Sequence, residues 1–167
     1  RVPPCAAWPG VIKPETRSDA ALTSVDLLPT FAELSGASLP TNQPVDGCSF
    51  AKILQGQRAL QNRAIFWHYP LYLSGEGYNK VLPVYGTDTM YWRAVPSSVI
   101  RQGDYKLIYY YEYDNYKLFN LREDLSEEND LAQKIPKKAK RLRDELMAWV
   151  EETKAPVPTI TNPKFAP

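Results

Sequence analysis

Three β-rich runs in close succession constrain the fold of this chain more than any other feature of its sequence. They cover residues 97–101, 105–112 and 116–121, and short polar turns at 102–104 and 113–115 separate them. Gly, Asp and Asn in those turns are the residues that reverse a strand tightly. The pattern predicts an antiparallel β-meander.

A helix that could cover this meander follows it in the sequence. Residues 136–154 begin with Pro136, which is favoured at the first helical position. Apolar residues then recur at helical spacing, at Ala139, Leu142, Leu146, Trp149 and Val150. Tyrosines at 109–111 place aromatic rings on both faces of the meander, so we expect one face to pack on this helix. The basic first turns of the helix are interpreted as a solvated face, with binding of an acidic partner as the alternative.

The N-terminal part of the chain shows a different pattern. Residues 2–8 are apolar without alternation, which predicts a short strand buried on both faces. A helix is expected from Asp26 as N-cap to Gly36 just past its end. Its predicted buried stripe consists of Leu27, Leu28, Phe31 and Leu34.

Shorter elements are expected between these two parts. Residues 49–55 predict a short helix that stops at Gly56, and residues 64–69 predict a strand that ends at Pro70. Residues 71–96 show few periodic signals and are expected to form a long loop, while the proline-rich residues after Ala155 are expected to lie over the surface.

Charge and cysteine content exclude several classes of function. Twenty Lys+Arg and nineteen Asp+Glu give a net charge of +1, so we expect no nucleic-acid partner and no attraction to an anionic membrane. No apolar run approaches the roughly 20 residues of a membrane span. Cys5 and Cys48 lie in no zinc-binding pattern and are interpreted as buried free thiols, with one disulfide as the alternative.

Motifs for catalysis are missing from the sequence. His68 is the only histidine, and nothing near it in the sequence identifies a nucleophile. The chain has no nucleophile elbow, phosphate-binding loop, EF-hand or zinc-protease motif. The paired carboxylates at 127–128, 144–145 and 151–152 lie in or near charged helices, where they serve solubility. We therefore expect no catalytic residue and no metal ligand in this chain.

Several short motifs nevertheless occur in an order that resembles a known family. They resemble the C-terminal portion of formylglycine-dependent, arylsulfatase-like sulfatases of the alkaline-phosphatase superfamily. In chain order the motifs are Arg1-Val2-Pro3, Trp8-Pro9-Gly10, Ser24-Val25-Asp26-Leu27-Leu28-Pro29-Thr30, Asp46-Gly47-Cys48-Ser49-Phe50, Phe66-Trp67-His68-Tyr69-Pro70, the run 100–108, and the segments 118–124 and 128–132.

The resemblance implies an α+β fold in two parts. Residues 1–62 would be the incomplete C-terminal end of the large α/β catalytic domain. Residues 63–167 would be a C-terminal subdomain in which the antiparallel meander packs on the C-terminal helix. Because a strand at residues 2–8 would lack its neighbours in this chain, the isolated fragment is expected to self-associate or to be marginally stable.

The resemblance also implies a function for the longer parent protein. Such a sulfatase hydrolyses the sulfate ester of a sulfated carbohydrate or of an aryl sulfate substrate. It uses a formylglycine and a calcium ion, and it is periplasmic or secreted. The formylglycine arises from Cys or Ser in a Cys/Ser-x-Pro-x-Arg motif. Residues 38–42 have Asn42 where Arg is needed, and residues 48–52 lack the proline. We therefore expect formylglycine and calcium in the upstream catalytic domain, which would be a partner of this chain.

Because the resemblance places the reactive groups upstream, it implies that the residues of this chain contribute to substrate recognition. A sulfated sugar needs hydrogen-bond donors and an aromatic platform, and the C-terminal subdomain of such enzymes borders the cleft. His68, Tyr69 and Tyr72 are the first candidates for substrate contact, followed by Arg93 and Arg101. A structural, hydrogen-bonded His68 is the alternative. For the whole chain the alternative is a stand-alone, non-catalytic module that binds a glycan or a protein.

Overall fold

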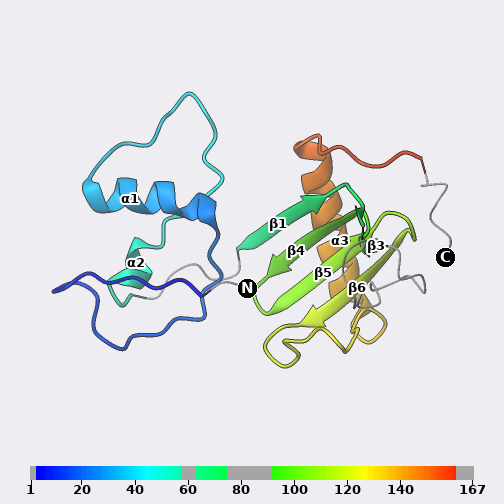
Figure 1. Ribbon diagram of the computed structural model, residues 1–167, viewed down its shortest axis with the longest axis horizontal. Coiled ribbons are helices and arrows are strands. Elements are labelled where there is room, and N and C mark those ends of the chain that lie inside the picture. The colour runs from blue at the N-terminus through cyan, green and yellow to red at the C-terminus, as the bar shows by residue number, and fades with distance from the viewer. Residues whose placement is uncertain (1–2, 58–62, 75–91, 161–167) are drawn as a thin grey trace. The chain divides into compact units, whose positions relative to one another are not determined.

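The computed structural model describes residues 3–57, 63–74 and 92–160, and the chain divides into two compact units (Figure 1). Unit 1 comprises residues 1–63 and unit 2 comprises residues 64–167. None of the helices in the described residues has the length and apolar character needed to cross a bilayer. Each unit is described by itself below.

Unit 2 is built on a four-stranded antiparallel sheet. Its strands are β1 (Ala64–Tyr69), β4 (Ser97–Gln102), β5 (Tyr105–Tyr110) and β6 (Asn115–Asn120), in the order β1-β4-β5-β6. The predicted meander is confirmed as β4-β5-β6, and the predicted strand 64–69 is confirmed as β1. β1 extends the meander by pairing with β4 across the intervening segment.

A small second ladder lies within the segment that was expected to be a loop. Leu73 of β2 (Leu73–Ser74) pairs with Ala94 of β3 (Trp92–Ala94). The expectation of an uninterrupted loop over residues 71–96 is therefore wrong at its two ends, and its middle lies outside the described residues. The physical reason is that β1 and β4 already bring the two ends of this segment together, so main-chain pairing continues for a few residues beyond the sheet.

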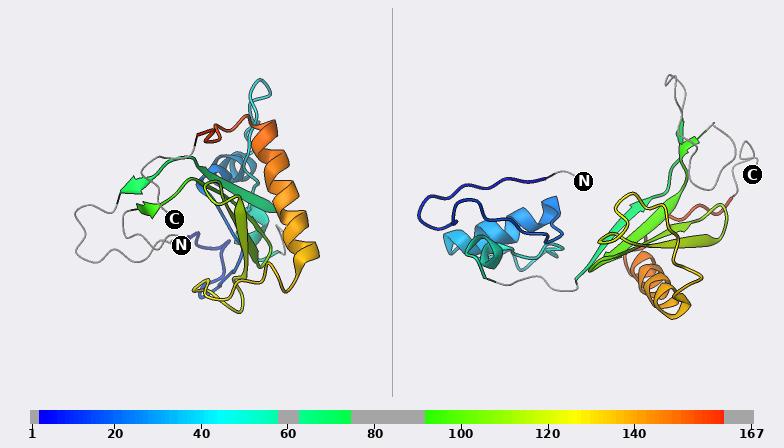
Figure 2. Two further views of the ribbon diagram at one scale, coloured as in Figure 1. Left: turned by 90° about the vertical axis from the view of Figure 1, so that its right-hand side faces the viewer. Right: turned by 90° about the horizontal axis from the view of Figure 1, so that it is seen from below.

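Helix α3 (Pro136–Glu152) covers one face of the sheet, as Figure 2 shows. Phe66, Ile100, Leu107 and Leu118 form one row across the four strands in register, and this row faces the helix. The helix contributes four buried residues to the same core, Ala139, Leu142, Leu146 and Val150. The ring of Trp149 stacks on Phe66 with 4.8 Å between centroids. The predicted packing of the meander on the last helix is confirmed, and with it the α+β fold class.

Unit 1 contains short helices connected by loops. They are the 3₁₀ turn η1 (Ser24–Asp26), α1 (Leu27–Ser35) and α2 (Ala51–Leu54). The predicted end of α1 is confirmed, because Gly36 adopts the left-handed conformation at φ 72°. Asp26 is the N-cap residue as expected, but its side chain makes no capping hydrogen bond.

Three expectations for unit 1 are wrong. Residues 3–8 form no strand and are exposed, because the described part of unit 1 contains no strand with which they could pair. The predicted buried stripe of α1 is largely exposed, at 44% for Leu27, 55% for Leu28 and 62% for Phe31. The helix instead buries Pro29, Thr30 and Ala32, and its Leu34 is half-buried. The third correction concerns the cysteines, Cys5 and Cys48, which are both free and both exposed rather than buried.

Candidate functional site

His68 lies near the end of β1 and is hydrogen-bonded through both ring nitrogens. Its Nε2 lies 2.9 Å from the carbonyl oxygen of Pro156, and its Nδ1 lies 2.7 Å from Ser98 Oγ. Because a carbonyl can only accept, the proton of the neutral ring is assigned to Nε2, and Nδ1 then accepts from the Ser98 hydroxyl. Ser98 Oγ in turn lies 2.7 Å from the hydroxyl of Tyr111, which is the donor in this arrangement.

This relay is not a serine–histidine nucleophile pair. Ser98 is completely buried, so a substrate cannot reach its hydroxyl. Burial raises the pKa of the Tyr111 hydroxyl, so this hydroxyl keeps its proton and can donate it to Ser98. The relay therefore consists of groups whose hydrogen bonds satisfy one another. It fixes the orientation of the His68 ring and holds the chain after α3 against β1.

Tyr69 follows His68 and lies on the other face of the sheet, since successive strand residues point to opposite sides. Trp67 shares that face, away from α3. Tyr69 is 39% exposed and Trp67 is 46% exposed. Both residues adjoin His68 in the sequence. A sugar ring can pack its apolar face on such aromatic rings, while the Tyr O–H and the Trp N–H form hydrogen bonds.

The other predicted site residues are spread along the strands. Arg101 pairs with Ile65, whereas Tyr69 pairs with Ser97 at the opposite end of the same ladder. Four residues at about 3.4 Å each separate Arg101 from the position opposite Tyr69 by roughly 14 Å. Tyr72 is half-buried just before β2. The backbone of Arg93 lies in β3, and its side chain is outside the described residues.

Trp67, Ser98 and Tyr111 are the residues around His68 that the sequence did not single out. Trp67 could have been found, because strand alternation places it on the same face as Tyr69. Ser98 and Tyr111 could not, because their contact with His68 depends on the register between β1 and β4. That register is a tertiary property that no local pattern specifies.

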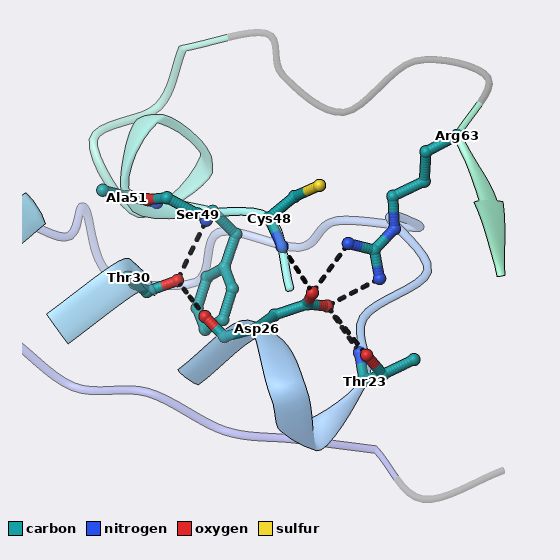
Figure 3. A network of polar contacts seen from close by, with 8 residues as sticks. Thr23, Asp26, Thr30, Cys48, Ser49, Ala51 and Arg63 are labelled. Carbon is teal, nitrogen blue, oxygen red and sulfur yellow. Dashed lines mark hydrogen bonds and ion pairs between the residues drawn. The ribbon is translucent and has the colours of Figure 1, made fainter. Parts of the chain in front are cut away.

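The best-defined polar network of unit 1 is centred on Asp26, as Figure 3 shows. Asp26 is completely buried and accepts two hydrogen bonds from the Arg63 guanidinium, each 2.7 Å long. Its carboxylate also accepts the backbone N–H groups of Thr23 and Cys48, at 2.7 and 2.9 Å. Burial alone would raise the pKa of Asp26, but Arg63 and these N–H groups together lower it below the ordinary carboxyl value.

The surrounding residues show that this network is structural. Thr30 Oγ1 donates to the Asp26 carbonyl at 2.6 Å and accepts from the Phe50 N–H at 3.0 Å (Figure 3). A Cβ at Gly47 would lie 2.0 Å from the Val25 carbonyl oxygen, so only glycine fits there. The network thus holds the 47–50 segment and Arg63 against α1. In the described residues, no group of three or more His, Cys, Asp or Glu side chains could hold a metal ion.

Comparison with known proteins gives a family match along most of the chain. Residues 1–155 match the sequence model described as "N-sulphoglucosamine sulphohydrolase, C-terminal". A protein named "Sulfatase" from Formosa agariphila is 33% identical over 171 residues, which cover 93% of this chain and 28% of that protein. Mouse arylsulfatase G is 39% identical over 66 residues, which cover 40% of this chain and 13% of that protein. The chain thus spans less than a third of the length of these relatives.

Solved structures show the same fold. The crystal structure of Ps i-CgsB matches with a TM-score of 0.62 at 21% identity, over 85% of this chain and 27% of that one. A putative sulfatase from Bacteroides thetaiotaomicron matches with a TM-score of 0.53 at 24% identity, over 77% and 24%. A structure in complex with its substrate D-glucosamine-2-N,6-O-disulfate matches with a TM-score of 0.52 at 22% identity, over 84% and 25%.

Proposed function

Because this chain belongs to the family of N-sulphoglucosamine sulphohydrolase C-terminal domains, we propose that it is the C-terminal part of a longer sulfatase that hydrolyses sulfate esters of a carbohydrate. The family match over residues 1–155 is the observation that carries this proposal. One solved relative of the same fold is described with a sulfated glucosamine as its substrate, which agrees with a carbohydrate as the substrate class here.

The exposed apolar side of α1 supports a role as part of a larger domain. Leu27, Leu28 and Phe31 are exposed on a helix whose other side is held by the Asp26 network. Large apolar side chains grouped on one helix face are normally covered in a complete domain. We propose that the catalytic domain preceding this chain covers them, and that residues 1–62 are the end of that domain.

Unit 2 is proposed to border the substrate cleft. Tyr69 and the neighbouring Trp67 offer exposed rings for a sugar, and Tyr72 lies three residues further along the chain. Arg93 and Arg101 are proposed to meet sulfate groups, since a guanidinium matches the geometry of a tetrahedral anion. His68 is proposed as a further substrate contact through its Nε2–H, which here donates to the Pro156 carbonyl, and its side chain lies on the opposite face of β1 from Tyr69.

The reactive groups of the proposed enzyme belong to its preceding part. A formylglycine nucleophile and a calcium ion would be held there, and the residues of this chain would support and shape the pocket. We also propose that the enzyme is periplasmic or secreted, as expected of a protein that acts on polymeric sulfated carbohydrates.

The proposed function is tested with the longer protein that contains this chain. Produced together with an enzyme that installs formylglycine, it is expected to release sulfate from a sulfated saccharide such as glucosamine 6-sulfate. The variant Y69A is expected to raise KM more than it lowers kcat, whereas L125A, at an exposed leucine, serves as the control. Hydrolysis of phosphate diesters without hydrolysis of any sulfate ester would overturn the proposed reaction class.

A further inference from the structure

The beginning of α3 and the residues before it carry a dense cluster of positive charge. From Leu131 to Arg143 the sequence contains six Lys and Arg residues and no Asp or Glu. The net charge of the whole chain is only +1, so this cluster is a local feature. Its exposed members form what we call the basic face: Lys134, Lys137, Lys140 and Arg141.

Part of this charge is not neutralised by carboxylates. Lys140 pairs with Asp144, and Arg141 pairs with Glu145, one turn further along α3. Lys134 and Lys137 are exposed and form no ion pair within the described part of the chain. The ammonium group of Lys138 lies 3.7 Å from the centroid of the Tyr105 ring. Because this ring is neutral, the contact does not cancel the positive charge of Lys138.

The position of these cations on the helix is unfavourable for stability. The first turn of α3 contains no acidic residue, and its N-cap, Ile135, forms no side-chain cap. The N-terminus of a helix is the positive end of its dipole, so lysines there repel it where acidic residues would stabilise it. Natural sequences depart from such local rules mainly where a function needs the departure. The positive charge therefore indicates a ligand of negative charge.

We propose that the basic face binds a sulfated polysaccharide chain through several of its sulfate groups at once. The identity of this polyanion rests on the proposed function, and the site itself rests on the residues above. The basic face lies at the end of the sheet marked by Gln102 and Tyr105, which Arg141 and Lys138 contact. Tyr69 lies at the other end of the ladders. The basic face would therefore bind different sugar units of the polymer from the unit that contacts Tyr69.

Charge reversal on the basic face tests the proposal, because binding and stability should then change in opposite directions. The variant K134E/K137E changes the two unpaired lysines, and K13E/K52E makes the same change in net charge at two exposed lysines of unit 1. Heparin serves as the sulfated polysaccharide, and its affinity for the whole chain is measured by titration calorimetry at several salt concentrations. K134E/K137E is expected to bind heparin about tenfold more weakly and to melt about 2 °C higher. K13E/K52E should keep the affinity of the unaltered chain.

Three results would overturn the proposal. They are unchanged heparin affinity in K134E/K137E, an equal loss in K13E/K52E, and binding of a double-stranded oligonucleotide of the same charge as tightly as heparin. The last result would show general attraction of polyanions. Heparin binding is measured without turnover on this chain, whereas the proposed function is judged by sulfate release from the longer protein. Failure of one can therefore be told from failure of the other.

Discussion

The carboxylate of Asp26 shows how one buried residue can join three separate segments. It accepts hydrogen bonds from Thr23, Cys48 and Arg63 at once. The variant D26N would leave the Arg63 guanidinium without its ion pair in a largely enclosed position. We expect a loss of about 3 kcal/mol in the free energy of unfolding at pH 7, measured by urea denaturation.

The same carboxylate makes stability depend on pH. Because the pKa of Asp26 is lowered in the folded state, the unfolded chain binds the proton more readily. The stabilisation is fully present above the ordinary carboxyl pKa of about 3.9 and is lost as the pH falls through the lowered folded value. D26N should therefore lose less stability than the unaltered chain between pH 5 and pH 2. E33Q, at an exposed carboxylate of α1, is the control, and an equal pH dependence in D26N and E33Q would contradict the assignment.

The buried Ser98 hydroxyl provides a second prediction for a single residue. S98A removes the donor to His68 Nδ1 and the acceptor for the Tyr111 hydroxyl, both within a buried relay. We expect a loss of about 2 kcal/mol in unfolding free energy and, in nitrogen NMR of the ring, a shift of the Nδ1 signal, which loses its hydrogen bond, while the Pro156 carbonyl keeps the proton on Nε2. S97A, at the neighbouring strand residue, should leave the His68 signals unchanged. An unchanged Nδ1 signal in S98A would contradict the relay.

Some of these residue roles could be predicted from the sequence and others could not. Asp26 was correctly placed at the start of α1, because the N-cap preference and Pro29 are local signals. Its partner Arg63 lies 37 positions further along the sequence, and no local pattern specifies such a contact. The position of Tyr69 on a strand was also predictable, whereas its role at a substrate cleft stays a prediction.

Among the elements, α3 makes the largest contribution to the core of unit 2. Leu146 is completely buried against the row formed by Ile100, Leu107 and Leu118. L146A should remove about 3 kcal/mol from the free energy of unfolding, because it deletes buried methyl groups and leaves a cavity. L125A makes the same substitution at an exposed leucine and should change stability by less than about 0.5 kcal/mol. Similar losses in both variants would show that α3 does not pack on the sheet in solution.

The elements that were predicted correctly are those with strong local signals. The meander alternates β-rich runs with turn residues, and α3 combines an N1 proline with helical spacing, so neither needs information from distant residues. Residues 3–8 were misread because an apolar run indicates burial without identifying the element that buries it. The stripe of α1 was misread for the same reason, since its apolar face has no cover among the described residues of unit 1.

For the whole molecule, the exposed face of α1 predicts association. Leu28 and Phe31 are more than half exposed, and contact between copies would remove them from water. We expect the chain to form dimers or larger species at micromolar concentration in sedimentation velocity. The variant L28K/F31K should be largely monomeric, because two charges on this face oppose its burial.

A matched variant separates this face from a general effect of added charge. L125K/I160K places two lysines at exposed apolar residues of unit 2 and should associate like the unaltered chain. A monomeric unaltered chain with a sharp thermal transition would contradict the proposal that a preceding domain covers α1. Association that L125K/I160K abolishes equally would mean that charge, rather than this helix face, decides it.

The pairing of β1 with β4 has a consequence for how the protein can change over evolution. The chain between Tyr69 and Ser97 closes as a loop when these two residues pair, and the entropy of such a closure grows only with the logarithm of loop length. Doubling the segment would cost only about 0.6 kcal/mol. Insertions there can therefore create new binding surfaces next to Tyr69 while the sheet and its core remain intact.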